Sequence, residues 1–143
     1  MPRNNESRMQ QAFVRWWDVA FRSLGVPDKR LLFAIPNGGA RNAVTGAVLK
    51  AEGVRRGVPD LMLAVPVDGY RTNGQSGDGY AEEWFSSHGL FLEFKTSEGR
   101  VSEEQESMQA FLRTCGYVVA VVRGFDEAER AITRYLRGEE VCA

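Results

Sequence analysis

The sequence predicts an α/β fold, in which helices cover the faces of a sheet. Segments with the 3.6-residue apolar spacing of helices alternate along the chain with short apolar runs that are typical of buried strands. The chain has 143 residues, of which 43% are hydrophobic, and this is enough for one domain with one core. We therefore expect a single domain over residues 1–143.

The first half of the chain begins with an amphipathic helix that we expect to end near Gly25. A short strand follows at 31–35, and the turn-forming stretch "PNGGARN" closes it. The segment 43–53 predicts a short helix, which Gly46 weakens. These elements alternate as an α/β domain requires.

The second half supplies the strands and helices of the predicted core. Apolar runs predict strands at about 60–65 and 90–95, followed by a helix at about 103–114. A further strand is expected at 117–122. The last helix carries the sequence "DEAERAITRYL", with Asp126 as its expected N-cap.

A polar segment at about 67–88 separates two of these strands. It is rich in Gly, Ser, Asn and Asp, and connections of this length are usually functional or disordered. We expect either a long hairpin or an inserted loop. Trp84 and Phe85 could anchor it to the domain, contact a partner subunit or stack on bases.

Cysteine usage and hydropathy indicate a cytoplasmic protein with no membrane partner. No apolar run approaches the roughly 20 residues that a membrane-spanning helix needs. The polar start "MPRNNESR" does not resemble a signal peptide. Cys115 and Cys142 fit neither a metal-ligand spacing nor a disulfide framework.

Charge is unevenly distributed, although the net charge is only −1. Residues 1–59 contain ten Lys and Arg against four acids, a balance of +6, and the remainder has eight against fifteen, a balance of −7. A basic half is compatible with nucleic-acid binding, because phosphate attraction depends on the local field. An ordinary solvated surface explains the same pattern.

Three charged residues occur in the two strands that should form the core. Glu93 and Lys95 are two residues apart and share a face of one strand, whereas Asp60 begins the other strand after a proline. A solvated face or a lysine-protected edge would explain Glu93 and Lys95. Alternatively, two adjacent carboxylates would repel unless a cation lay between them, and oxygen ligands suit Mg²⁺ or Mn²⁺.

Two further polar residues lie on the inward stripes of predicted helices. Glu6 is three residues before Met9 and so faces the protein body, although an acid near a helix start also complements the helix dipole. Gln105 closes a capping box with Ser102, yet it shares a helical stripe with apolar residues. Both residues therefore have a structural and a functional interpretation.

Two stretches, "GVRRGVPDLMLAVP" and "GLFLEFKTSEGRVSEEQESMQAFLRTCGYVVAVVRGFDEA", carry a resemblance to a known family. They look like the VRR-NUC (virus-type replication-repair nuclease) family of the PD-(D/E)xK nuclease superfamily. The motif of that family matches Asp60 and Glu93-Phe94-Lys95, and its helical acid and its later glutamine match Glu6 and Gln105. The stretch 67–88 is longer than expected between these strands.

The resemblance implies a restriction-endonuclease-like fold, a mixed sheet flanked by helices, and a metal-dependent endonuclease acting on DNA. Mg²⁺ or Mn²⁺ would be bound by Asp60, Glu93, the backbone carbonyl of Phe94 and Glu6, directly or through water. Lys95 would act on the attacking water or the oxyanion, and Gln105 could hold this lysine or a scissile phosphate oxygen. Stand-alone members of this size resemble homodimers that cut branched DNA such as four-way (Holliday) junctions in repair or in phage.

We expect DNA binding through the basic first half, by backbone and shape rather than base sequence. Two other functions stay open: a non-cleaving DNA-binding or interaction module, and a PD-(D/E)xK nuclease that acts on duplex ends or specific sequences. The candidate DNA-binding residues are Asn37, Arg41, Lys50, Arg55 and Arg56.

Overall fold

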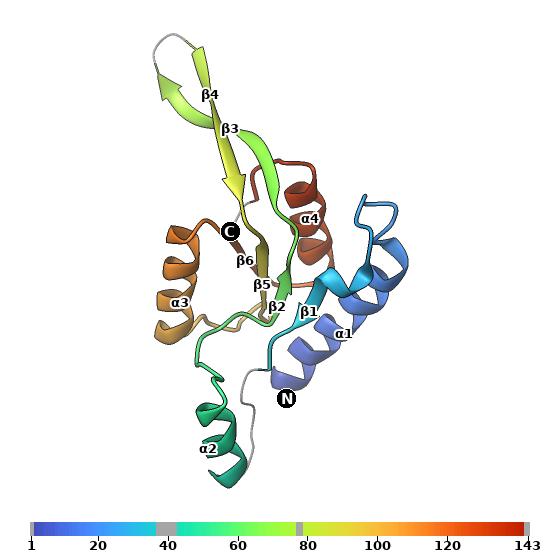
Figure 1. The fold of residues 1–143 in the computed structure, drawn as a ribbon, viewed down its shortest axis with the longest axis vertical. Coiled ribbons are helices and arrows are strands. Elements are labelled where there is room, and N and C mark those ends of the chain that lie inside the picture. The colour runs from blue at the N-terminus through green and yellow to red at the C-terminus, as the bar shows by residue number, and fades with distance from the viewer. Residues whose placement is uncertain (1, 37–42, 77–78, 142–143) are drawn as a thin grey trace.

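A computed structural model of the chain describes residues 2–36, 43–76 and 79–141, as a mixed sheet with helices on its faces (Figure 1). This arrangement confirms the predicted α/β fold class. In chain order the elements are α1 (Pro2–Ala20), the short 3-10 helix η1 (Lys29–Leu31), β1 (Leu32–Ala34), α2 (Ala43–Ala51), β2 (Leu61–Leu63), β3 (Val67–Ser76), β4 (Gly79–Ser87), β5 (Leu90–Phe94), α3 (Glu103–Thr114), β6 (Val118–Val122) and α4 (Phe125–Leu136).

The main sheet has four strands in the order β1-β2-β5-β6. β1 pairs with β2 and β2 with β5 in antiparallel directions, whereas β5 and β6 run parallel. A parallel pair needs a crossover between its strands, and α3 supplies it. Because β5 is central, β2 pairs with its first part and β6 with its whole length, and at its carboxyl end the Phe94 N–H bonds to the Asp60 carboxylate.

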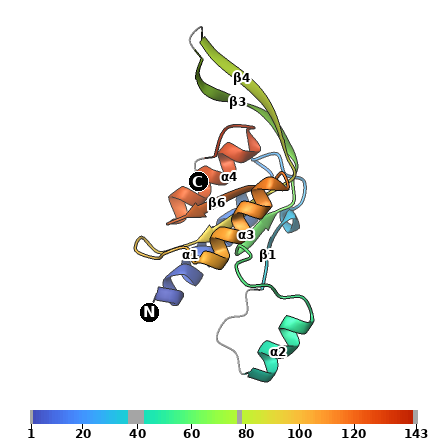
Figure 2. The ribbon, with the colours of Figure 1, turned by 90° about the vertical axis from the view of Figure 1, so that its left-hand side faces the viewer.

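Helices α1 and α4 cover one face of the sheet and α3 covers the other (Figure 1), and Figure 2 views the molecule from the α3 side. The core lies on the α1/α4 side, where the even-numbered residues of β5 and β6 meet aromatic side chains of α1. Fully burying a side chain of this size stabilises the fold by about 1.5–3 kcal/mol. The best-buried members of this core include Phe13, Trp17, Leu61, Leu63, Leu90, Leu92, Phe94, Ile132 and Tyr135.

The polar segment that separates β2 from β5 folds as a hairpin of β3 and β4, which leaves the main sheet and extends away from the domain (Figure 1). At its base the Tyr135 hydroxyl donates to the Val65 carbonyl at 2.6 Å. Gly69 packs so closely on the C-terminal turn that an added Cβ would lie 2.2 Å from the Gly138 carbonyl. Of the two aromatic residues, Trp84 is 55% exposed and Phe85 is half-buried, so Phe85 is the one that suits an anchor.

Two predicted helix boundaries were wrong. The first helix ends at Ala20, and turns lead from there to Gly25. The N-cap of α4 is Gly124 instead of Asp126, which lies in the first turn. An acid in that position interacts with the helix dipole without capping the backbone.

Within the described residues, no helix is long and apolar enough to cross a membrane.

Candidate functional site

The two predicted metal-binding acids meet at one end of the sheet. Leu61 pairs with Leu92, and Asp60 directly precedes Leu61, so Asp60 lies beside the carboxyl end of β5. Its charge acts on Glu93 there. The Asp60 carboxylate also accepts a hydrogen bond of 2.7 Å from the backbone N–H of Phe94. Two strands therefore bring both acids to one place, beside the end of β5.

Glu93 is the least exposed acid of this group, with only 2% of its surface accessible. Its Oε1 accepts a hydrogen bond of 2.8 Å from Gln105 Nε2 and lies 3.7 Å from Lys95 Nζ. Its Oε2 has no hydrogen-bond partner among the residues that the structure describes. Burial, with the negative charges of Asp60 and Glu6, raises the pKa of Glu93 from 4.5 to about 8, against a lowering by Lys95. The site therefore favours a bound proton or a bound cation at this carboxyl group.

Lys95 follows β5 directly and lies in the interior of the site. Its side chain is 12% exposed, and its backbone N–H donates to the Val122 carbonyl at 3.0 Å. β5 lies between β2 and β6, so Lys95 cannot be the lysine of a protected sheet edge. Its ammonium group faces the Glu93 carboxylate, which makes it the cationic side chain of the site.

Gln105 performs both of the roles that its sequence position suggested. Its backbone N–H donates to the Ser102 hydroxyl, and its own Oε1 accepts from the Ser102 backbone N–H at 2.9 Å, which completes the capping box. Its Nε2 meanwhile donates to Glu93. The bonds fix the glutamine between the start of α3 and the buried acid, so α3 orients Glu93.

Glu6 reaches the site from α1. Its Oε1 accepts a hydrogen bond of 3.4 Å from the backbone N–H of Thr96, next to Lys95. Because α1 begins at Pro2, Glu6 lies beyond the first turn, where complementation of the helix dipole has weakened. The inward-facing interpretation of Glu6 is the one that these contacts support.

The site offers two acidic side chains and nearby backbone carbonyls to a cation. Within the described residues, no three His, Cys, Asp or Glu side chains form a group that could hold a metal ion by themselves. Mg²⁺ usually takes only one or two carboxylates and completes its shell with waters and substrate phosphate. Asp60 and Glu93, with the buried and unpartnered Oε2 of Glu93, fit that more open kind of site.

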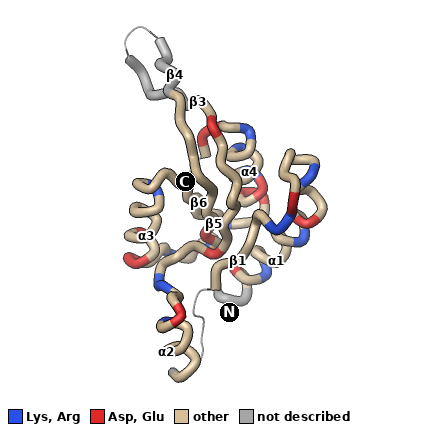
Figure 3. The backbone as a smooth tube through the Cα atoms, in the orientation of Figure 1, with Lys and Arg blue, Asp and Glu red and all other residues tan. Residues whose placement is uncertain are grey.

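Three of the five candidate DNA-binding residues can be placed. Lys50, Arg55 and Arg56 are exposed along α2 and the segment that follows it, which stand away from the main body of the domain (Figure 3). Asn37 and Arg41 lie outside the described residues. These three residues, hereafter the basic strip, are exposed in the segment that leads toward Asp60, which also carries the exposed acid Glu52.

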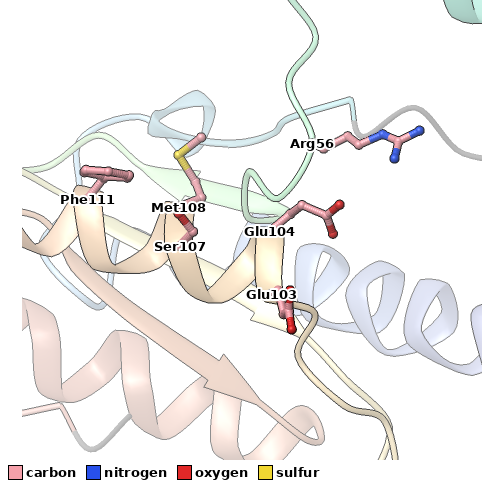
Figure 4. A pocket seen from close by; sticks show the side chains of 6 residues that line it. All are labelled: Arg56, Glu103, Glu104, Ser107, Met108 and Phe111. Atoms are coloured by element: carbon pink, nitrogen blue, oxygen red, sulfur yellow. The ribbon is translucent and has the colours of Figure 1, made fainter.

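Arg56 also lines a shallow groove of about 380 Å³ against the outer face of α3 (Figure 4). The groove combines this arginine with two glutamates and apolar surface, so it is not uniformly basic. It lies outside the site, since Glu93 and Gln105 do not line it. Its other residues are Glu103, Glu104, Ser107, Met108 and Phe111.

The single histidine lies away from the site. His88 precedes β5, at the opposite end of the strand from Glu93, and its exposed ring packs edge-on against Tyr117 with centroids 5.8 Å apart.

One residue next to the site was missed in the sequence, Arg123, whose guanidinium group bonds to the loop after Lys95. Arg123 follows β6. Because β6 runs parallel to β5, the residues after these two strands lie at the same end of the sheet, and this was the signal in the sequence that could have identified Arg123.

Comparisons with known proteins agree with this fold. A family model described as the VRR-NUC domain matches residues 4–126. A solved structure described as a VRR_NUC domain protein is 21% identical, covers 94% of this chain and 90% of its own, and superposes with a TM-score of 0.65. No curated protein matches the chain. The family match spans most of the sequence, including every acid of the site, and the chain belongs to the VRR-NUC family.

Proposed function

We propose that this protein is a divalent-metal-dependent DNA endonuclease, and that it acts on branched DNA such as Holliday junctions. The VRR-NUC domain gives it a nuclease-type fold. The observation that carries the proposal is the buried Glu93 carboxylate, which lies beside Asp60 and is held by Gln105 with Lys95 at 3.7 Å. A purely structural acid in a core strand would have its charge fully compensated, whereas one oxygen of Glu93 has no hydrogen-bond partner among the described residues.

The residues around that oxygen suit Mg²⁺ or Mn²⁺. Asp60, Glu93 and the backbone carbonyl of Phe94 would hold the ion, with Glu6 as a ligand directly or through water. Such an ion supplies positive charge to the scissile phosphate and acidifies a water. The chain itself contributes the orientation: the Phe94 N–H holds Asp60 and the Gln105 amide holds Glu93, so both carboxylates are fixed before substrate arrives.

Lys95 is the general acid–base or electrostatic group of the proposal. Its ammonium lies within the shielded end of the sheet, where it would orient or deprotonate the attacking water or stabilise the developing oxyanion. Gln105 was expected to hold either this lysine or a phosphate oxygen. Since its amide is bonded to Glu93, we assign it the orientation of that carboxylate instead.

The basic strip and the number of sites per chain support the proposed substrate and assembly. Lys50, Arg55 and Arg56 are exposed beside the segment that delivers Asp60, and these residues would bind phosphates without reading base edges. Each chain carries one such set of catalytic groups and would cut one strand. Paired cuts across a junction therefore need two subunits, and we propose a homodimer.

A panel of DNA substrates tests the proposal. Linear duplex, single-stranded, flap and four-way-junction DNA are incubated with the protein in Mg²⁺, Mn²⁺ or EDTA, and Lys95→Ala serves as the control for contaminating nuclease. We expect cuts in the junction that require metal and that are lost in the variant. DNA binding without any product in either metal would instead support a non-cleaving module. Preference for duplex ends or for one sequence would support another kind of nuclease.

A further inference from the structure

Arg123 bonds to the loop that carries the proposed catalytic lysine. The residue follows β6, and its Nη1 donates to two backbone carbonyls of that loop, Thr96 at 2.8 Å and Gly99 at 2.6 Å. Its own backbone N–H donates to Glu127 Oε2 at 2.7 Å, in the first turn of α4. One exposed arginine thus ties the loop after β5 to the junction between β6 and α4.

The loop at 95–102 connects several groups of the site. Lys95 begins it, and the N–H of Thr96 donates to Glu6. Gly99 packs against the same acid: an added Cβ would lie 3.3 Å from Glu6 Oε1 and 3.0 Å from Thr96 Oγ1. The loop ends at the capping box of α3, where Gln105 reaches Glu93. A shift of this loop would therefore disturb both the backbone next to Lys95 and the contact with Glu6.

The ends of the loop are held more firmly than its middle. β5 fixes one end through its two neighbouring strands, and the Ser102 capping box fixes the other. A connection without regular secondary structure has considerable conformational entropy unless tertiary contacts restrict it. The contact with Glu6 is long, at 3.4 Å, whereas the two bonds from Arg123 are short and charge-assisted.

We propose that Arg123 is a positioning residue of the nuclease site, which holds the loop so that Lys95 and Glu6 keep their places. The inference rests on the proposed function for its effect on cleavage, but not for its effect on the loop. The alternative role of an exposed arginine at this end of the sheet is direct binding of a DNA phosphate. The two roles differ in what they change: positioning affects kcat, whereas phosphate binding affects KM.

The test compares Arg123→Gln with Arg130→Gln, which removes an exposed arginine from α4. In Arg123→Gln we expect kcat on junction DNA to fall about 10- to 100-fold, since a displacement near 1 Å of catalytic groups costs rates of this order, while KM changes less than about threefold. Amide hydrogen exchange over 95–102 in the metal-free protein should rise about tenfold, as expected when a local opening loses its charge-assisted bonds. The melting temperature of Arg123→Gln should equal that of the wild type. Arg130→Gln should match the wild type in kcat, KM and amide exchange.

Arg123→Lys extends the test, because an ammonium group can still donate to one or both carbonyls. It should restore part of kcat and part of the protection from exchange, and it replaces Arg123→Gln if that variant does not fold. Unchanged exchange over 95–102 would overturn the inference, as would a raised KM with unchanged kcat. If the wild-type protein cleaves no DNA, the proposed function fails, while the exchange measurement still decides whether Arg123 holds the loop.

Discussion

Replacing Glu93 by glutamine separates the effect of its buried carboxyl group on stability from its role in cleavage. Glutamine has nearly the same shape, and its Oε1 can still accept the hydrogen bond from Gln105. The substitution removes a buried carboxyl group, whose pKa burial and the charge of Asp60 raise from 4.5 to about 8 in the folded protein. We expect Glu93→Gln to stabilise the metal-free protein at neutral pH and to abolish cleavage.

The magnitude follows from the proton that Glu93 retains on folding. Between pH 4.5 and about 8 the folded protein holds a proton that the unfolded chain has lost, so the free energy of unfolding falls as pH rises through this window. Linkage gives a cost of about 1 kcal/mol at pH 5 and about 4 kcal/mol at pH 7.5. The stability difference between variant and wild type should therefore increase by about 3 kcal/mol between these pH values.

Urea unfolding in EDTA at pH 5 and pH 7.5 measures this difference directly. Changes in titrating groups that do not interact with Glu93 are common to both proteins and cancel, as does any constant effect of the altered side chain. Glu52→Gln, which removes an exposed carboxylate after α2, serves as the control and should show no comparable increase. An equal difference at the two pH values would refute the argument that Glu93 is held in an environment hostile to its charge.

Three other perturbations test separate parts of the account. Lys95→Ala should slow single-turnover cleavage by about 10²-fold or more, the usual contribution of such a group, and leave DNA binding in a gel-shift assay unchanged; full activity would remove this lysine from the mechanism. Gly57→Ala should lower the free energy of unfolding by about 1–3 kcal/mol, because φ is +84° and the added Cβ would lie 2.4 Å from the Glu104 carbonyl. Gly46→Ala has open space in α2 and should be stabilising; equal effects in both would contradict the packing described. DNA affinity should fall steeply with salt, and Arg56→Gln should reduce the slope of log K against log [salt] by about 1, whereas an unchanged slope would exclude a phosphate contact.

Local pattern was sufficient to predict most of the secondary structure. Apolar spacing located the helices and the central strands, since period 3.6 and continuous apolar runs reflect which side chains face the core. The capping box at Ser102 is confirmed, and it could be predicted because both of its residues lie within three positions of each other. Where the cap depended on backbone geometry, as at Gly124, the residue types alone gave the wrong position.

The site was only partly predictable, because its geometry is set by contacts between distant segments. The chemistry of three charges in core strands indicated that Asp60 and Glu93 belong together, and the pairing of β2 with β5 brings Asp60 to the end of β5, where it bonds to the Phe94 N–H. The sequence could not show that Gln105 bonds to Glu93 while it also caps α3. Nor could it show the bonds that Arg123 makes, since their acceptors are 24 and 27 residues away.

The position of a bound ion tests the central claim most directly. Crystals of the protein grown or soaked with Mn²⁺ would be measured for anomalous scattering, in wild type and in Asp60→Asn. The account predicts a peak between the carboxylates of Asp60 and Glu93 that is lost or much reduced in the variant. A peak elsewhere, or none here at a saturating concentration of Mn²⁺, would contradict it.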